Sequence, residues 1–191
     1  MPLVLKETHP SNQRYTYADY RSWSDGERWE LIGGVPHAMS PSPTWWHQDI
    51  CVNLLFQIAG FLKNKPCKVL VAPLDVRLNA DTKDDTVVQP DLFIVCDRSK
   101  LDEKGSCRGA PDMVVEVLSP STARHDSLVK LRLYQNAGVR EYWIVDPDNR
   151  TVMVNVLENG KYAITWYDED EAVPIFVLEG FQVNLRELFE Q

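Results

Sequence analysis

The sequence has no excess of basic residues: its 191 residues include 20 Lys and Arg against 28 Asp and Glu, which gives a net charge of -8. Proteins that bind nucleic acid usually present a basic face to the phosphate backbone. The composition therefore offers no basic footprint for a nucleic-acid binder, and it argues against a nuclease. An enzyme of this composition that acts on nucleic acid would need a local positive patch, a bound metal ion or a groove formed by a dimer.

Cysteine is scarce as well. The four cysteines form no CxxC pair and show no zinc-type spacing with the four histidines, which excludes a zinc finger. Two of them lie in apolar runs, so we expect reduced and mostly buried thiols in a cytoplasmic protein. The cysteines are Cys51, Cys67, Cys96 and Cys107.

Long hydrophobic runs are also absent. No stretch of the sequence is long enough to span a membrane, and Met1 to Tyr20 lacks the apolar core of a signal peptide. The chain has neither a phosphate-binding glycine loop nor the nucleophile elbow of hydrolases. These absences exclude a membrane protein, a nucleotide-binding P-loop enzyme and a serine hydrolase, and they leave metal-dependent chemistry open.

The composition is that of an ordinary globular protein, with 44% hydrophobic and 25% charged residues. A chain of this length is most simply one domain, residues 1–191, in which residues 1–14 are expected to be flexible. Helix and strand signals alternate along it, which predicts an α/β (α+β) fold with a mixed β-sheet flanked by helices.

Helical spacing of apolar residues and capping signals predict four helices. They are Thr16–Trp23, Thr44–Lys63, Asp126–Gly138 and Asn184–Phe189. Strands are predicted from apolar runs bounded by glycine, proline and polar turns. They are Trp29–Ile32, Val35–Met39, Lys68–Leu78, Pro90–Cys96, Pro111–Leu118, Glu141–Val145, Thr151–Leu157 and Tyr162–Tyr167.

Two acidic residues lie in segments that otherwise have the pattern of buried strands. Asp91 opens one predicted strand, and Glu116 comes late in the next. A buried carboxylate is costly unless a cation or hydrogen-bond donors compensate it. If the two strands pair antiparallel, the start of one lies beside the end of the other. Asp91 and Glu116 would then meet, and their oxygens would suit Mg²⁺.

The motifs Pro90-Asp91 and Glu116-Val117-Leu118 resemble the PD-(D/E)XK nuclease superfamily, which has the restriction-endonuclease-like fold. Longer segments are more specific, and they resemble a large bacterial family of restriction endonucleases that was formerly a domain of unknown function. These segments are Pro111 to Thr122, Lys130-Leu131 followed by Tyr134, Gly138-Val139, and Glu141 to Pro147. The resemblance covers the chain from Tyr17 to Tyr162.

The resemblance implies a metal site. In the superfamily the aspartate and the glutamate bind Mg²⁺, which here would be Asp91 and Glu116, together with the carbonyl of Val117. Mn²⁺ suits the same oxygen ligands. The superfamily also places a lysine two residues after the glutamate, where this chain has Leu118.

The family places its lysine on the following helix, and Lys130 matches that position. By the resemblance, Lys130 would orient or activate the attacking water and stabilise the charge that develops on the phosphate. Glu30 matches an N-terminal acidic position of the family and would bind the metal through water.

Each of these residues also has a structural alternative. Asp91 could simply begin a strand, and Glu30 could pair with Arg28 at the surface. Lys130 could be a solvated helix residue, and Arg132 would then compete with it as the basic residue of the site. These alternatives stay open at the level of the sequence.

Other polar and aromatic residues are weaker candidates. His47 begins the long helix, where it could contact a phosphate, although a capping or core role is favoured. Gln89 could reach the site from beside Asp91. Asp112 shares a strand face with Glu116 but lies about 13 Å away along the strand, so we expect it to begin the strand. Tyr142 and Trp143 point to opposite faces, which would place one in the core and leave the other for a dimer contact.

The first functional hypothesis is a Mg²⁺-dependent endonuclease that hydrolyses DNA, acts in the cytoplasm and forms a homodimer, because two strands need two sites. One alternative is a binding or regulatory module that keeps the fold without efficient cleavage. Another is a metal-dependent hydrolase of a small phosphorylated substrate, which would explain the missing basic groove.

Overall fold

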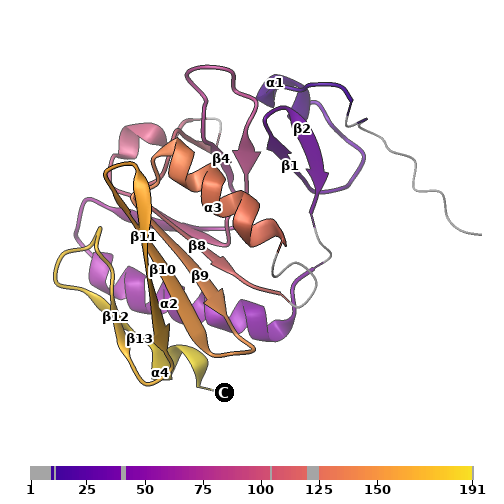
Figure 1. Cartoon of the computed structure of the whole chain (residues 1–191). Coiled ribbons are helices and arrows are strands. Elements are labelled where there is room, and N and C mark those ends of the chain that lie inside the picture. Colours follow the sequence, from indigo (N-terminus) through magenta and orange to yellow (C-terminus); the bar gives the residue numbers. More distant parts are fainter. Residues whose placement is uncertain (1–9, 11, 40–41, 104, 120–124, 191) are drawn as a thin grey trace, which may run out of the picture.

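Figure 1 shows the computed structural model of the chain. It describes residues 10, 12–39, 42–103, 105–119 and 125–190, the last segment with side chains from residue 129 onward. The expected flexibility of residues 1–14 falls mostly outside these residues. Within the described part of the chain, no helix is long and apolar enough to cross a membrane.

A six-stranded mixed sheet forms the centre of the fold, in the order β11-β10-β9-β8-β6-β3. Neighbouring strands are antiparallel except β8 and β9, which are parallel and are connected through helix α3. The strands are β3 (Lys68–Val71), β6 (Leu92–Val95), β8 (Met113–Val117), β9 (Glu141–Asp146), β10 (Thr151–Glu158) and β11 (Lys161–Asp168). The predicted mixed sheet flanked by helices is confirmed.

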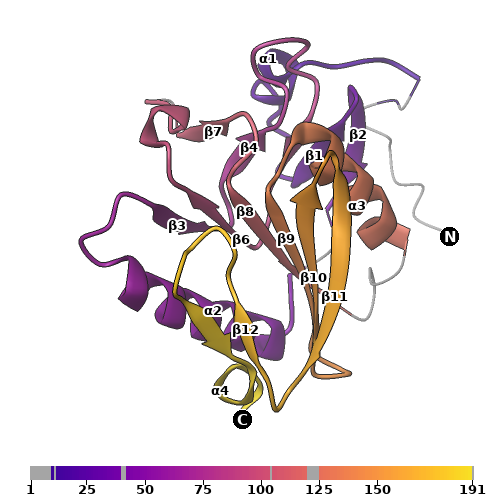
Figure 2. The ribbon, with the colours of Figure 1, turned by 60° about the vertical axis from the view of Figure 1, so that its left-hand side comes forward.

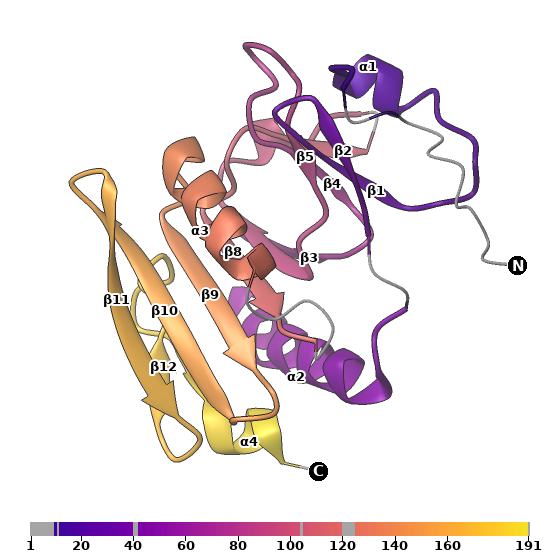
Figure 3. The same ribbon diagram turned by 45° about the vertical axis from the view of Figure 1, so that its right-hand side comes forward.

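Helix α2 (Trp45–Leu62) covers one face of this sheet, as Figures 1 and 3 show. Its buried residues recur at helical spacing and pack against the alternate side chains of β6 and β8 that point the same way. Thr44 caps the helix by accepting a hydrogen bond from the N–H of His47. The C-terminal elements join the same layer: β12 (Ala172–Pro174), β13 (Gln182–Asn184) and α4 (Leu185–Phe189).

Helix α3 (His125–Ala137) covers the opposite face. Tyr134 is buried there against Val114 and Tyr142 of the sheet. The side chains of β8 therefore alternate between two helical layers, and Glu116 belongs to the layer of α3 together with Val114.

A second sheet of five short strands lies beside the first, in the order β2-β1-β5-β4-β7 (Figure 2). Its strands are β1 (Trp29–Ile32), β2 (Val35–Ala38), β4 (Asp75–Arg77), β5 (Val87–Val88) and β7 (Ser106–Arg108). Helix α1 (Tyr17–Tyr20) packs against it, and a 3-10 turn, η1 (Arg98–Lys100), precedes β7.

The single strand predicted for Lys68–Leu78 is wrong. The segment forms two strands that belong to different sheets, β3 in the six-stranded sheet and β4 in the second. Pro73 lies between them, and proline has no N–H to donate to a ladder. The break carries the chain from one sheet to the other.

The expectation of four reduced cysteines is wrong for two of them. Cys67 and Cys96 flank β3 and β6, directly beyond the paired residues Lys68 and Val95, and they form a disulfide. Cys51 and Cys107 are free thiols. The antiparallel pairing of two strands brings Cys67 and Cys96 together, and their spacing in the sequence does not reveal it.

The expectation that Tyr142 or Trp143 would be free for a dimer contact is also wrong. Both side chains are buried, Trp143 in the layer of α2 and Tyr142 in the layer of α3. Strand β9 lies inside a sheet that helices cover on both faces, so either orientation leads into a core.

Candidate active site

The start of β6 lies beside the end of β8. The two strands pair antiparallel with Leu92 opposite Val115, as expected from the sequence. Asp91, just before β6, therefore reaches the C-terminal end of β8. Its Oδ2 accepts a hydrogen bond of 2.8 Å from the N–H of Val117, the residue after Glu116. The sheet thus brings the two predicted acidic residues together.

Lys130 joins them from helix α3, which covers the face of the sheet to which Glu116 belongs. Its Nζ lies 2.9 Å from Glu116 Oε1, and the hydroxyl of Tyr134 donates a second hydrogen bond of 2.7 Å to the same oxygen. Lys130 and Tyr134 are one helical turn apart on α3, so both point at the sheet. Lys130 is not a solvated helix residue, whereas its neighbour Arg132 is exposed.

Glu30 completes this group from the second sheet. It is buried on β1, and its Oε1 lies 3.1 Å from Lys130 Nζ and accepts a 3.1 Å hydrogen bond from the N–H of Gln89. The alternative in which Glu30 pairs with Arg28 does not hold, because Arg28 donates to the side-chain oxygen of Gln89 instead. One ammonium group therefore sits between two carboxylates, Glu30 and Glu116.

The electrostatics of this group are dominated by burial. Desolvation raises the pKa of Glu116 above its ordinary value despite the opposing charge of Lys130, and the charges of Asp91 and Glu30 raise it further. Burial disfavours the charged form of Lys130, but the charges and hydrogen bonds of Glu116 and Glu30 outweigh it, and its pKa is raised. The acidic side of the site thus carries more negative charge than one lysine neutralises.

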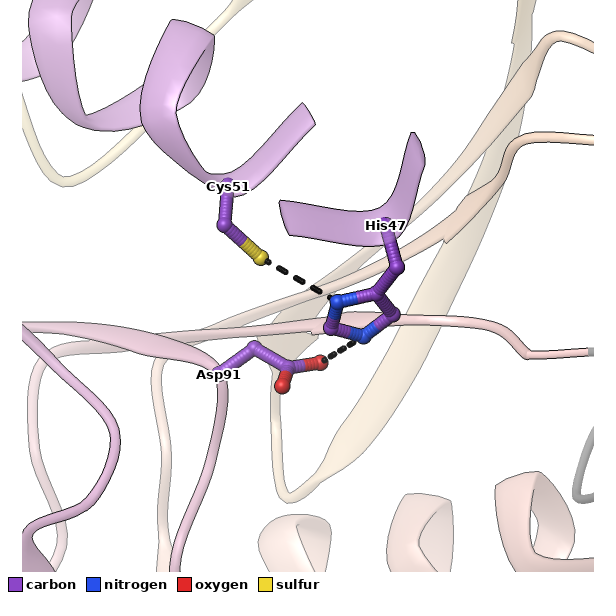
Figure 4. A group of neighbouring side chains, drawn as sticks. All are labelled: His47, Cys51 and Asp91. Carbon is purple, nitrogen blue, oxygen red and sulfur yellow. Dashed lines mark hydrogen bonds and ion pairs between the residues drawn. The ribbon is translucent and has the colours of Figure 1, made fainter. Parts of the chain in front are cut away.

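His47, which was only a weak candidate in the sequence, lies in the site. Its Nε2 lies 3.2 Å from Asp91 Oδ2, and its Nδ1 lies 3.7 Å from Cys51 Sγ, one turn further along α2 (Figure 4). Burial lowers the pKa of His47, but the hydrogen bond and the charge of Asp91, with smaller contributions from the Val117 backbone and Glu116, outweigh it, so the pKa is raised. The favoured capping or core role is therefore incomplete: the ring is buried, and it is aimed at Asp91.

Two weaker candidates have structural roles. Asp112 lies at the far end of β8, where it accepts a 2.8 Å hydrogen bond from the N–H of Cys96 and pairs with Arg140. The amide group of Gln89 donates to Asp75 Oδ1 and to the hydroxyl of Tyr20. Gln89 therefore supports the site through its backbone contact with Glu30.

The donor set suits a divalent cation. Asp91 and Glu116 converge where both helical layers meet the end of the sheet, and their carboxylates supply the oxygens that Mg²⁺ and Mn²⁺ prefer. The groups of His47, Cys51 and Asp91 that can bind metal lie within 4.8 Å of one another. A cation here would also compensate the burial and the charges of Asp91 and Glu30, which together raise the pKa of Glu116.

An Asp–Glu pair at the ends of two antiparallel strands, joined by a lysine, on a mixed sheet between helices defines a restriction-endonuclease-like protein. The chain belongs to the Uma2 family, described as "Putative restriction endonuclease", whose family model matches residues 17–186. No curated protein matches the chain in sequence.

The fold is also that of a solved structure. A crystal structure from Anabaena variabilis ATCC 29413, titled as that of a "putative nuclease belonging to DUF820", superposes with a TM-score of 0.74 at 21% sequence identity. The match covers 92% of this chain and 97% of that one. At this identity the similarity shows the shared fold.

Proposed function

We propose that the protein is a metal-dependent endonuclease that hydrolyses phosphodiester bonds in DNA. The observation that carries the proposal is the convergence of Asp91, Glu116 and Lys130 from three different elements on one end of the sheet. Packing of the core does not explain why these three residues lie together. Each carries a charge in a largely buried setting, and burying a charge costs free energy, which is typical of a functional site.

Asp91, Glu116 and the carbonyl of Val117 would hold Mg²⁺ or Mn²⁺. We include His47 as a further ligand through Nε2, since that nitrogen already faces Asp91. A proton on Nδ1, directed at Cys51 Sγ, would leave the lone pair of Nε2 free for a metal. The bound cation would lower the pKa of a water molecule and neutralise charge on the scissile phosphate.

The remaining residues act on the water and on the phosphate. Lys130 would orient the attacking water and stabilise the negative charge of the pentavalent transition state. Glu30 positions the lysine, whose ammonium donates a hydrogen bond to it, and Tyr134 positions Glu116 by donating a hydrogen bond to its carboxylate. Glu30 would also contact a water molecule bound to the metal, as the family resemblance implies.

Family membership favours a nucleic acid as substrate, and a homodimer would supply two sites for two strands. The net charge of -8 is the observation that favours a second candidate, a hydrolase of a small phosphorylated compound. The two candidates share the metal site and differ in the size of the substrate.

The test is nicking of supercoiled plasmid in Mg²⁺ or Mn²⁺ by the wild type, Glu116→Gln, Lys130→Met and the control Arg132→Met. We expect cleavage by the wild type and the control, and loss of about 100-fold or more in the two site variants. Circular dichroism checks that each variant is folded.

Cleavage that persists in Glu116→Gln would reveal a contaminating nuclease and end the assignment. If the wild type does not cut plasmid but hydrolyses a small phosphodiester, with the same dependence on Glu116, the second candidate replaces the first. If neither substrate is cut and Mn²⁺ still binds, the chain is a binding module on the same fold.

A further inference from the structure

Strand β11 forms one edge of the six-stranded sheet, and its outer side carries no strand among the described residues. Its sequence, KYAITWYD, is uncharged between its two ends and contains no proline. Natural edge strands are usually blunted by internal charges, proline or bulges, because an open edge pairs with other chains. In β11, Ile164 and Trp166 instead remain 51% and 62% exposed on the same strand face.

The hydrogen-bonding direction of β11 follows from its hairpin. Glu158 and Lys161 close a two-residue turn, so Lys161 and every second residue after it bond to β10. The even-numbered residues therefore direct their backbone groups outward. Two contacts agree with this assignment: the N–H of Tyr162 donates to Gln135 of α3, and the N–H of Asp168 donates to Glu171.

The side chains of Gln135 and Glu171 thus cap the two ends of the open edge and leave its middle available for pairing. Ile164 and Trp166 lie between these two contacts. Their N–H groups point away from β10, and among the described residues neither is seen to donate a hydrogen bond to another partner. The edge therefore presents two neighbouring outward N–H groups and two exposed apolar side chains at the same residues.

We propose that β11 pairs antiparallel with β11 of a second copy of this chain, with Ile164 opposite Trp166 of the second copy. A two-fold axis perpendicular to the sheet keeps the faces aligned, so even residues must pair with even residues. Of the registers that this allows, the one centred on Thr165 uses the two free amides of each chain and leaves both caps intact. The register centred on Ile164 would instead require Tyr162 to release Gln135.

Side chains in this register are complementary. Ile164 and Trp166 of the two copies form a single apolar cluster of four residues on one face. Beyond the ladder, at each of its ends, Lys161 of one copy lies on the side of Glu169 of the second copy, where their opposite charges attract; Glu169 also pairs with Arg150. This complementarity of charge and the self-matching pattern of free amides favour a second copy over an unrelated partner. The inference stands apart from the proposed nuclease activity.

The first test is sedimentation equilibrium of the wild type, Trp166→Lys and the matched control Phe56→Lys. Phe56 is 80% exposed on α2, away from the edge. Its replacement by lysine also exchanges an exposed aromatic side chain for a positive charge, as Trp166→Lys does, but outside the proposed interface. We expect a wild-type dimer, a dimer Kd about 100-fold weaker in Trp166→Lys, and no change in Phe56→Lys. A wild type that stays monomeric at high micromolar concentration, or a dimer that Trp166→Lys leaves intact, would overturn the proposal.

The second test fixes the register by oxidative cross-linking of variants with one added cysteine, made in a Cys51→Ser/Cys107→Ser background that has no other free thiol. The proposed register places Thr165 opposite itself on the axis, where Thr165→Cys would form a symmetric disulfide between chains. Ala163→Cys faces Tyr167 of the second copy and is the control. Efficient cross-linking of Thr165→Cys alone supports the register, and cross-linking of Ile164→Cys in its place refutes it.

Discussion

Lys130 Nζ lies 2.9 Å from Glu116 Oε1 although the two residues are 14 positions apart and the position two residues after the glutamate holds Leu118. The ammonium reaches the carboxylate from a helix packed over the sheet, not from the same strand. Leu118 instead packs at the margin of the core beside α3. The fold thus supplies an ammonium group to Glu116 from helix α3, although the strand itself offers none at position 118.

This arrangement predicts how Lys130→Met will affect stability. The substitution leaves Glu116 and Glu30 buried without their shared cation, and we expect the free energy of unfolding to fall by about 3 kcal/mol. Adding Glu116→Gln to the variant removes one of the orphaned charges and should recover part of that loss. Urea unfolding of the single and double variants measures both effects. A double variant less stable than Lys130→Met would show that the carboxylate is held by contacts other than the lysine.

The position of His47 predicts a distinct effect on metal affinity. If Nε2 is a ligand, His47→Ala should weaken Mn²⁺ binding by at least about 10-fold. Mg²⁺ binding should weaken less, because Mg²⁺ prefers oxygen ligands and Mn²⁺ accepts imidazole more readily. Isothermal titration calorimetry with each ion gives the comparison, with the exposed His37→Ala as the control. Equal losses for the two ions would mean that His47 only orients Asp91.

The sequence predicted the acidic pair on the condition that the two strands pair antiparallel, and the structure meets this condition. Asp91 and Glu116 met as expected, and Lys130 matched a position known from the family resemblance. His47 was only a weak candidate in the sequence, because its role depends on which face of α2 packs over the start of β6. A histidine and a cysteine one turn apart on a core helix were the available signal.

The elements that the sequence missed are short and are defined by their partners. Strands β5 and β7 have two and three residues, and each exists because another strand of the second sheet pairs with it. Pro73 was present in the sequence, but only the position of β4 beside β5 shows that the chain changes sheets there. Local propensity cannot specify such pairings.

The Cys67–Cys96 disulfide predicts a measurable contribution to stability. It closes a loop with a sequence separation of 29, for which the loss of chain entropy in the unfolded state corresponds to about 3.6 kcal/mol. Urea unfolding with and without reductant, and of the Cys67→Ser/Cys96→Ser variant, should show this difference. The Cys51→Ser/Cys107→Ser variant keeps the bridge and should still respond to reductant. If that response is absent, the bridge does not form in solution.

Glu141 predicts a pH dependence that is independent of the metal site. It is fully buried on β9, where its carboxylate accepts hydrogen bonds of 2.7 Å from the indole N–H of Trp143 and 2.9 Å from the N–H of Val177. Burial raises the pKa of Glu141 above its ordinary value of 4.5, and these donors only partly offset the rise. The folded protein therefore holds this proton more tightly than the unfolded chain does.

The direction of the effect follows by linkage. Below pH 4.5 the side chain is protonated in both states and its contribution is complete. As the pH rises toward the raised pKa, only the unfolded chain has lost the proton, so this contribution to the free energy of unfolding decreases. Glu141→Gln cannot titrate, and the advantage of the wild type over this variant should therefore shrink between pH 4.5 and neutrality. Urea unfolding at several pH values in this range gives the difference, in which the contributions of all other groups cancel. An advantage that grows with pH would mean that the hydrogen bonds to Trp143 and Val177 outweigh burial, and that the pKa of Glu141 is lowered.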